Sequence, residues 1–273
     1  MPAIKDWLAN ASRQLLDVGV PSANLDAEII LANAMSKDRT YLHSRTEQII
    51  DTDQIKQADA GLNLRIKRVP IAYIIGHKEF YGRPFITTPA VLIPRPESEA
   101  IIDLLKQIPI SHFPTPNPRL VDVGTGSGIL GITAKLEFPN LNVTLTDVSA
   151  DALQIAQQNA IKLSVDVPVI QSDLLQNYTE KPDIIIANLP YVDKVWERST
   201  ETHFEPDLAL FADNHGLALI EKLIVQANKL LDQNGYLVLE ADPVQHESII
   251  EYANNQSFDL VQKLDYAVAL RRR

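Results

Sequence analysis

The sequence predicts an α/β fold with a mostly parallel sheet, preceded by a small bundle of helices. The β-branched run Ile184–Ile186 suits a strand buried on both faces. The apolar run Leu120–Val123 suits a second strand, because it leads into glycines and then an apolar helix. We therefore expect a helical domain over residues 1–73, a β-hairpin connector over 74–90 and an α/β domain over 91–273.

The front domain is expected to hold four helices. Pro2 suits the first position of the first helix, and Asn24 suits the cap of the second. A short helical segment then precedes a fourth helix, which Asp51 or Thr52 caps and Pro70 ends. These amphipathic helices carry no catalytic grouping, so we expect them to dock a substrate rather than to react with it.

The elements expected after the front domain alternate between strands and helices, as in a parallel sheet with helical crossovers. In chain order they are a hairpin at 73–85, a helix opened by Pro96 and ending at Leu105, a strand at 120–123, a helix at 129–136, a strand at 143–146, a helix at 151–163, strands at 167–170 and 184–186, a helix at 216–231, a strand at 235–240, and a closing antiparallel hairpin at 258–264 and 266–271.

The composition is that of an ordinary globular protein, with 45% hydrophobic and 22% charged residues among 273. The chain has no cysteine, which excludes disulfides and thiolate metal sites. His77 and Glu79 have no third ligand nearby, so we expect no metal site. No secretory signal and no apolar run of membrane-spanning length is evident. We expect a cytoplasmic monomer that does not bind membranes.

The charge is unevenly distributed along the chain. Residues 1–73 carry nine basic and nine acidic side chains, so the rest of the chain carries 16 and 26 and accounts for the net charge of −10. Proteins that bind nucleic acids usually present a basic surface to the phosphates. The acidic α/β part therefore argues against direct nucleic-acid binding and favours a protein partner with a basic face.

A glycine-rich turn, Gly124–Gly128, follows the strand at Leu120–Val123. Glycines let the backbone approach a ligand closely, and a helix N-terminus favours negative charge. Together with Gly131, the turn fits the dinucleotide-binding pattern; with Asp122 ahead of it, it also fits S-adenosylmethionine-dependent methyltransferases. Under both interpretations Asp147 ends a strand and can accept hydrogen bonds from ribose hydroxyls. The glycines alone do not decide between the two cofactors.

The tetrapeptide Asn188-Leu189-Pro190-Tyr191 favours the methyltransferase interpretation. The strand before it must end there, because Pro190 cannot donate to a ladder. Ligands of open α/β sheets bind just past the carboxyl ends of strands, so an amide, a free carbonyl and an aromatic ring lie where chemistry is expected. The two strands between the glycines and the tetrapeptide also fit the strand order of a methyltransferase sheet. Asp173, past the end of one of them, can accept from an adenine amino group.

The chain resembles the HemK/PrmC family, the methyltransferases that modify the glutamine of peptide chain release factors. The resemblance covers nearly the whole chain, and the motifs that carry it are Gly76-His77-x-Glu79-Phe80-Tyr81-Gly82, Ile93-Pro94-Arg95-Pro96-Glu97, Asp122 to Gly128, the tetrapeptide, and Phe204-Glu205-Pro206 with Ala209-Leu210. The tetrapeptide is shared with adenine and guanine amino-methyltransferases, and the Ile-Pro-Arg-Pro-Glu stretch favours the protein-glutamine branch. The resemblance implies a Rossmann-like class I methyltransferase sheet with an antiparallel C-terminal hairpin.

The same resemblance implies S-adenosylmethionine as cofactor and assigns roles to individual residues. The cofactor-binding residues would be Gly124, Thr125, Gly126, Ser127, Gly128, Asp147, Asp173, Leu174 and Asn188. The catalytic and substrate-binding residues would be Asn188, Leu189, Pro190 and Tyr191, which grip the glutamine of the Gly-Gly-Gln motif. The family usually has proline where this chain has Leu189, and its C-terminal hairpin is usually longer. Because position 189 would act through its backbone carbonyl, leucine can serve there.

Other functions fit parts of the sequence. An amino-methyltransferase acting on adenine or guanine in DNA or rRNA would solve the same chemical problem on a flipped base. A nicotinamide oxidoreductase fits the glycines and leaves the tetrapeptide unexplained. A catalytically inactive scaffold could bind the cofactor and a translation factor. Our prediction is a methyltransferase whose partners are release factors, without direct nucleic-acid contact.

Overall fold

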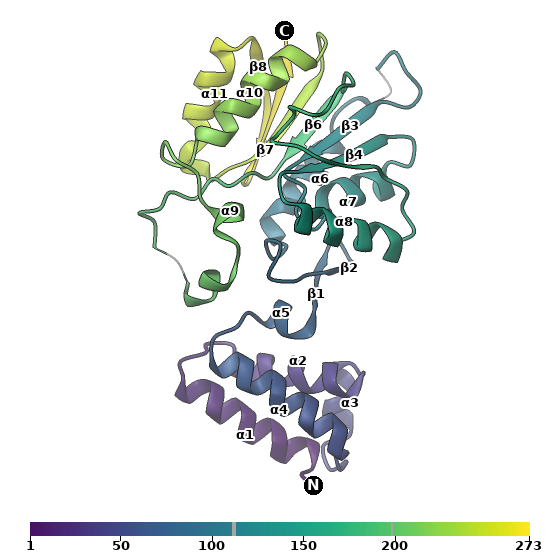
Figure 1. Ribbon diagram of the computed structural model, residues 1–273. Coiled ribbons are helices and arrows are strands. Elements are labelled where there is room, and N and C mark those ends of the chain that lie inside the picture. The colour runs from purple at the N-terminus through teal and green to yellow at the C-terminus, as the bar shows by residue number, and fades with distance from the viewer. Residues whose placement is uncertain (111–112, 198) are drawn as a thin grey trace. The chain divides into compact units, whose positions relative to one another are not determined.

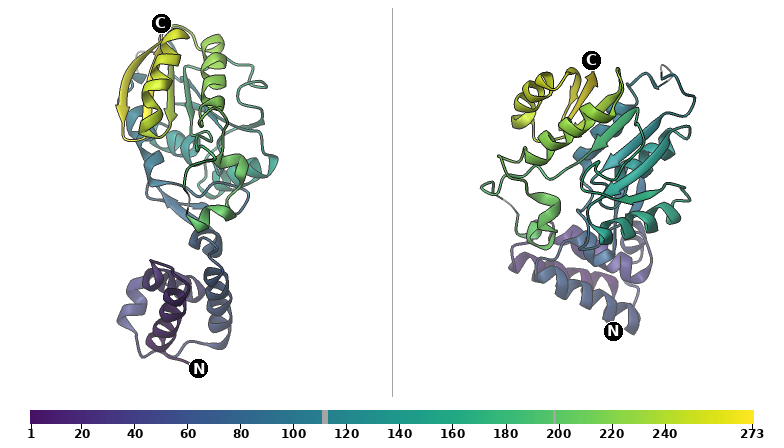
Figure 2. Two further views of the ribbon diagram at one scale, coloured as in Figure 1. Left: turned by 90° about the vertical axis from the view of Figure 1, so that its left-hand side faces the viewer. Right: turned by 45° about the horizontal axis from the view of Figure 1, so that its top comes forward.

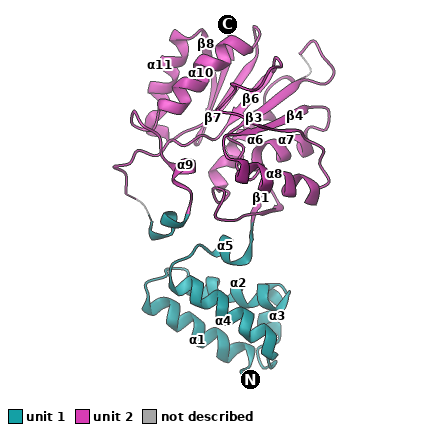
Figure 3. Ribbon diagram, in the orientation of Figure 1, with its two compact units in different colours: residues 1–77, 198–204 teal, residues 78–197, 205–273 magenta. Residues whose placement is uncertain are grey.

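The computed structural model describes residues 1–110, 113–197 and 199–273, and the chain divides into two compact units. Unit 1 comprises residues 1–77 and 198–204, and unit 2 comprises residues 78–197 and 205–273 (Figure 3). Each unit has hydrophobic clusters of its own. Among the described residues, no helix has the length and hydropathy needed to cross a membrane.

Unit 1 is a bundle of short helices (Figure 1). They are α1 (Ile4–Asp17), α2 (Ala23–Met35), α3 (Arg39–Ser44), α4 (Thr52–Ile66) and α5 (Ile71–Ile75). Asp51 caps α4 as expected, in a capping box with Gln54. The expected starts of the first two helices are wrong: Pro2 precedes the first helix, and Asn24 lies inside the second, whose first residue is already buried. Burial of apolar residues, rather than a side-chain cap, sets the start of α2.

A buried ion cluster joins α2 and α4 to a segment distant in sequence. The Arg65 guanidinium donates to Asp26 at 2.6 Å and to Glu201 at 3.1 Å. Arg68 donates to the same Glu201 carboxylate at 2.9 Å. Glu201 belongs to the short 3-10 helix η3 (Thr200–Phe204), so part of the segment that follows the tetrapeptide is held by the helical unit.

Unit 2 is built on a seven-stranded sheet of order β5-β4-β3-β6-β7-β9-β8. The strands are β3 (Arg119–Val123), β4 (Asn142–Asp147), β5 (Val169–Gln171), β6 (Ile184–Ala187), β7 (Tyr236–Glu240), β8 (Phe258–Leu264) and β9 (Ala267–Arg272). The first five in sequence are parallel, and β9 runs antiparallel to both β7 and β8. This arrangement confirms the predicted fold class.

A separate hairpin consists of β1 (His77–Phe80) and β2 (Arg83–Ile86). The expected hairpin began earlier, at Tyr73, but residues 73–75 lie in α5. Pro70 stands at the N-cap of that helix and Gly76, with φ of +77°, ends it. Tyr73, Ile74 and Ile75 are all apolar, and so short a run does not tell a strand from one helical turn.

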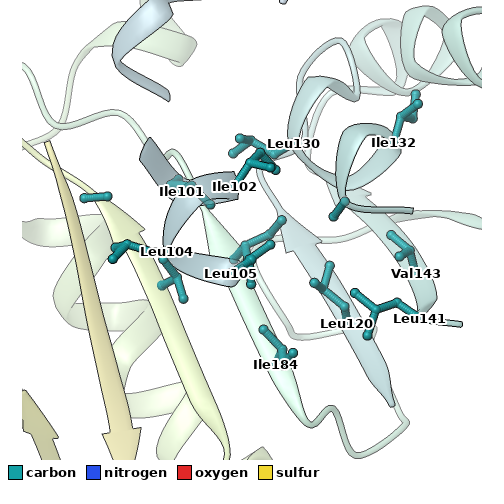
Figure 4. Close-up of a cluster of buried hydrophobic side chains, with 14 of the residues drawn as sticks. Ile101, Ile102, Leu104, Leu105, Leu120, Leu130, Ile132, Leu141, Val143 and Ile184 are labelled. Carbon is teal, nitrogen blue, oxygen red and sulfur yellow. The ribbon is translucent and has the colours of Figure 1, made fainter. Parts of the chain in front are cut away.

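Helices cover both faces of the sheet (Figures 1 and 2). They are η1 (Pro96–Ser98), α6 (Glu99–Leu105), α7 (Ile129–Glu137) and α8 (Ala150–Lys162) on one face, α10 (Ala218–Leu230) and α11 (His246–Asn255) on the other, with the short α9 (Asp207–Leu210) and η4 (Pro243–Gln245) in the loops. Successive side chains of a strand point to opposite faces of the sheet. Ile184 and Ile186 belong to the hydrophobic cluster on one face, and Ile185 belongs to the cluster on the other. Figure 4 shows α6 leucines and isoleucines beside Leu120 and Ile184.

Two of these helices, α9 and α11, were not predicted from the sequence. The α11 helix follows Pro243 and a capping box between Asp242 and Gln245. Its buried apolar residues, Ile249 and Ala253, lie four residues apart, as on one face of a helix. The cap and this spacing together could have indicated the helix.

The register of β3 and β6 positions the functional residues. Val123 pairs with Ala187, the last residue of β6, so the two parallel strands end at the same level. Gly124 and Asn188 are the next residues along each strand. The glycine-rich turn and the tetrapeptide therefore begin side by side at the carboxyl edge of the sheet.

Candidate active site

A cavity of about 250 Å³ opens at the carboxyl ends of β4, β3 and β6, within unit 2. Loops that follow these strands, the turn before α6 and the segment around α9 supply its walls. The lining residues include Ala90 to Arg95 and Ser98, Gly124 to Ser127, Asp147 to Ser149, Ser172 to Leu174, Asn188 to Pro190, and Pro206, Leu208 and Ala209. Most of the predicted cofactor-binding and substrate-binding residues therefore share one cavity. Gly128 and Tyr191 lie outside its lining.

The glycine-rich turn touches the tetrapeptide directly. A Cβ on Gly124 would lie 2.8 Å from Leu189 Cδ2, and its φ of +70° also favours glycine. A Cβ on Gly128 would lie 2.6 Å from Ile132 Cδ1, at the N-cap of α7. These two glycines are fixed by close packing, and at Gly128 the contacts are with Ile132 and Ala156 rather than with the cavity.

Asp122 fixes the glycine-rich turn through two hydrogen bonds. Its Oδ2 accepts hydrogen bonds from Thr125 Oγ1 at 2.6 Å and from the Gly131 amide at 2.8 Å. The carboxyl group is fully buried, and Oδ1 has no hydrogen-bond partner among the described residues. Burial raises the pKa of Asp122 to about 7. The charge of the nearby Asp147 also raises this pKa, whereas the hydrogen bonds from Thr125 and Gly131 lower it.

Asp147 and Asp173 differ in their surroundings. Asp147 accepts from the Gly126 and Ser149 amides, each at 2.9 Å, and burial raises its pKa. Asp173 lies on a more exposed edge and accepts from Lys222 Nζ at 2.7 Å and from Gln176 Nε2 at 2.8 Å. A carboxylate offers about four acceptor positions, so both groups retain capacity for a ligand.

Residues of other elements form hydrogen bonds with both ends of the tetrapeptide. Asn188 Nδ2 donates to the fully buried Ser98 Oγ at 2.9 Å. Tyr191 donates its hydroxyl to Glu240 Oε1 at 3.1 Å, and its carbonyl accepts from Gln245 Nε2 at 2.9 Å. Burial raises the pKa of Tyr191, and the neighbouring Glu240 charge adds to this, so its hydroxyl stays a donor.

The segment after the tetrapeptide is bonded to the turn before α6. The buried Glu205 carboxylate accepts from the Ile93 amide at 3.0 Å and from Arg95 at 2.5 Å. Both bonds lie within unit 2 and close one side of the cavity, which Arg95 lines. Pro206, the next residue, lines it as well.

Three functional-site residues had no assigned role in the sequence analysis: Ser98, Glu205 and Glu240. Glu240 is the last residue of β7, and ligands of open α/β sheets bind past the strand ends. Its position in the sequence could therefore have indicated that it lies near the site. Glu205 belongs to a motif that carried the family resemblance, and Ser98 directly follows another. Burial of these polar side chains, which makes them informative, appears only in the fold. The described residues hold no cluster of histidine and acidic side chains able to bind a metal ion.

The chain matches two protein-family models. Residues 6–76 match the PrmC N-terminal domain, and residues 93–204 match the methyltransferase small domain. The release factor glutamine methyltransferase of Koribacter versatilis is 37% identical over 263 residues, which cover 92% of each chain. That of Deinococcus radiodurans is 33% identical over 243 residues, which cover 88% of this chain and 86% of the relative.

A solved structure shows the same fold at low sequence identity. The Thermus thermophilus 16S rRNA N2 G1207 methyltransferase, in complex with AdoMet and guanosine, aligns with a TM-score of 0.53 and 17% identity. The alignment covers 72% of this chain and 50% of that one.

The strand order, the glycine-rich turn and these likenesses define a class I S-adenosylmethionine-dependent methyltransferase. Within that class, the chain belongs to the release factor glutamine methyltransferase family. The resemblance to the HemK/PrmC family seen in the sequence is thereby confirmed.

The buried Asp122 predicts an unusual dependence of stability on pH. Its pKa is about 7 in the folded chain against 3.8 ordinarily, so the folded state binds the proton more tightly. Its contribution to the free energy of unfolding should therefore fall as pH rises from about 4 to about 7, and then level off. Urea unfolding of the wild type and of Asp122→Asn at pH 5 and pH 8 measures this contribution. The wild type should lose ~1–4 kcal/mol more than the variant over that interval; equal losses would contradict the assignment.

Proposed function

We propose that this chain transfers a methyl group from S-adenosylmethionine to the side-chain amide nitrogen of the glutamine in the Gly-Gly-Gln motif of peptide chain release factors. The observation that carries the proposal is the placement of Asn188, Leu189 and Pro190 beside the glycine-rich turn in one cavity. The curated relatives that match nearly the whole chain are named for this activity.

We assign the cofactor to the Gly124–Gly128 turn, Asp147, Asp173 and Leu174. The backbone at Gly124 lies too close to Leu189 for a side chain to fit between them. The Gly126 amide donates a hydrogen bond to the Asp147 carboxylate. The remaining acceptor positions of Asp147 suit ribose hydroxyls, and Leu174 offers an apolar surface to the adenine. When bound, S-adenosylmethionine supplies an electrophilic methyl group.

The chemical problem is the low nucleophilicity of an amide nitrogen, whose lone pair is delocalised into its carbonyl. We propose that Asn188 Oδ1 and the Leu189 carbonyl each accept one amide hydrogen of the substrate. Asn188 Nδ2 is already committed to Ser98, which favours presentation of Oδ1 to the cavity. Two fixed acceptors would hold the nitrogen, direct its lone pair and stabilise positive charge as the bond forms. After methyl transfer, the nitrogen loses one of its two hydrogens as a proton, which can pass to water.

Tyr191 supports the site in a different way from the one the sequence suggested. The resemblance implies that Tyr191 grips the substrate glutamine, yet Tyr191 lies outside the cavity lining and donates a hydrogen bond to Glu240. We propose that it fixes the end of the tetrapeptide, and that Pro190 beside it contacts the substrate.

We further propose that the enzyme acts as a monomer in the cytoplasm on protein rather than nucleic acid. One chain supplies every residue named in the proposed site, so catalysis needs no second copy. The 26 acidic against 16 basic residues beyond residue 73 disfavour a polyanionic substrate.

A labelling experiment tests the substrate class. The protein is incubated with methyl-labelled S-adenosylmethionine and, in separate reactions, with release factor, genomic DNA and rRNA. Label should enter the release factor and be lost when its Gly-Gly-Gln glutamine is replaced by alanine. Label in nucleic acid alone would establish the amino-methyltransferase alternative, and cofactor binding without any label would establish the inactive scaffold.

The acceptor mechanism predicts unequal effects at neighbouring positions. Asn188→Ala removes an acceptor that matters most in the transition state, so kcat should fall by roughly 100-fold or more. Leu189→Pro keeps the backbone carbonyl and should leave kcat within roughly tenfold of the wild type. Thermal unfolding of each variant is the control, because Leu189 is buried against Gly124. Similar severe losses in two folded variants would exclude the carbonyl at position 189 as the second acceptor.

We propose that the helical part, residues 1–73, docks the protein substrate. It carries its own hydrophobic core and nine charges of each sign, and it supplies nothing to the cavity lining. A chain lacking it should keep its affinity for S-adenosylmethionine, and its KM for release factor should rise. That deletion also removes Arg65 and Arg68, the partners of Glu201.

The matched control for the deletion is Glu201→Gln in the chain that keeps residues 1–73, which loosens the η3 segment and keeps the helical surface. Its KM should rise much less than that of the deleted chain. Equal increases in KM would attribute the effect to the segment after the tetrapeptide, and an unchanged KM after deletion would remove the docking role.

A further inference from the structure

We infer that Gln245 is a positioning residue for methyl transfer, because its side-chain amide fixes the peptide group that follows Tyr191 at the end of the tetrapeptide. The inference rests on the proposed function of the tetrapeptide as the substrate-binding segment. Gln245 is the last residue of η4 and is 5% exposed, and it does not line the cavity. It therefore affects a bound substrate only through the residues that it holds.

Both amide protons of Gln245 have an acceptor in the fold. Nε2 donates to the Tyr191 carbonyl and to the His215 carbonyl, each at 2.9 Å. Oε1 accepts from the Asp242 amide at 3.1 Å, as part of the capping box of η4. With the amide turned over, its oxygen would face two carbonyl oxygens and its nitrogen would face an N–H group. Only one orientation of the side chain therefore satisfies all three backbone groups.

The peptide group between Tyr191 and Val192 is held through both of its polar atoms. Its carbonyl accepts from Gln245, and its N–H, that of Val192, donates to the Leu210 carbonyl at 3.0 Å. Leu210 is the last residue of α9, and the two residues before it line the cavity. The tetrapeptide and the α9 wall of the cavity are therefore joined at this peptide group, and the Gln245 hydrogen bond resists its rotation.

Gly216 leaves the space that this contact requires. A Cβ at position 216 would lie 2.0 Å from the Tyr191 oxygen and 2.6 Å from Gln245 Nε2, and the φ of +84° also favours glycine. The backbone therefore lies close around the amide. An apolar side chain in place of Gln245 would fill the same space but would leave the two carbonyls without this donor, which is costly for buried groups.

Gln245 acts on the part of the cavity to which we assign the substrate. Its amide holds the end of the tetrapeptide, whereas Asp122 fixes the glycine-rich turn through Thr125 and Gly131. Loss of the Gln245 amide should therefore misalign the proposed acceptors of the tetrapeptide and leave the proposed cofactor site intact.

Gln245→Met tests this role because methionine is similar in length and has no side-chain donor. Displacement of a reacting group by about 1 Å can cost on the order of 100-fold in rate, so kcat with release factor should fall by about 10–100-fold. The affinity for S-adenosylmethionine, measured by calorimetry, should change little. Amide hydrogen exchange at Val192 should become faster, because its peptide group is no longer held at the carbonyl.

Gln245→Glu is the second variant. It keeps the shape of the side chain and an acceptor for the Asp242 amide, but a carboxylate cannot donate to the two carbonyls. It should show the same pattern of slow turnover, preserved cofactor affinity and faster exchange at Val192. If one variant does not fold, the other decides.

The matched control is Asn228→Leu in α10. Asn228 accepts from Arg272 Nε at 3.0 Å, beyond the amino end of β7, and it does not line the cavity. This variant also loses a side-chain hydrogen bond at nearly constant size, but at the opposite edge of the sheet from the cavity. Its thermal stability should fall, while kcat and the exchange rate at Val192 should match those of the wild type.

The outcomes separate this role from the proposed function. Unchanged kcat in a folded Gln245 variant would overturn the role, and an equal loss of kcat in Asn228→Leu would reduce Gln245 to a structural residue. A loss of cofactor affinity as large as the loss of kcat would do the same. If the wild type does not label release factor, the proposed function fails and the role in methyl transfer fails with it, whereas exchange at Val192 still shows whether Gln245 holds the peptide group.

Discussion

The close approach of Gly124 and Leu189 is the constraint on which the site depends. Because β3 and β6 end at the same level, the glycine-rich turn, to which we assign the cofactor, and the tetrapeptide, to which we assign the substrate, must occupy adjacent space. A single Cβ at position 124 would meet the leucine at 2.8 Å. Forcing extra atoms into packed interiors costs ~1–3 kcal/mol and displaces backbone, which here would separate the glycine-rich turn from the tetrapeptide.

Hydrogen bonds from outside the cavity turn this proximity into a defined geometry. Asp122 fixes the turn through Thr125 and Gly131. On the other side, Gln245 holds the carbonyl of Tyr191, and Gly216 is so near that carbonyl that a Cβ would lie 2.0 Å from its oxygen. The strands at the centre of the sheet thus set the positions of the glycine-rich turn and the tetrapeptide. The hydrogen bonds of Asp122 and Gln245 set the orientation of these two segments. An enzyme that lacks a covalent intermediate depends on both.

Periodicity and strand-end motifs were enough to predict the sheet and to place the glycine-rich turn and the tetrapeptide past its strand ends, because buried β-branched runs and glycine turns are local signals. The failures have physical causes. Asn24 is a good capping residue, yet burial sets the start of α2, and the apolar run at residues 73–75 is too short to tell a strand from a helical turn. The attachment of Glu201 to Arg65 and the burial of Ser98 and Glu240 depend on contacts between distant residues, which no local pattern reveals.

The position of β9 has a consequence for how the protein is made. This strand lies between β7 and β8 and is almost wholly buried, although it is the last strand in sequence. During synthesis, β7 keeps an unpaired apolar edge until residues 267–272 emerge, because its other neighbour, β6, covers only one side. Exposed edges of this kind recruit other strands. Slow or interrupted translation before residues 267–272 have emerged should therefore favour aggregation of nascent chains over delivery of active enzyme.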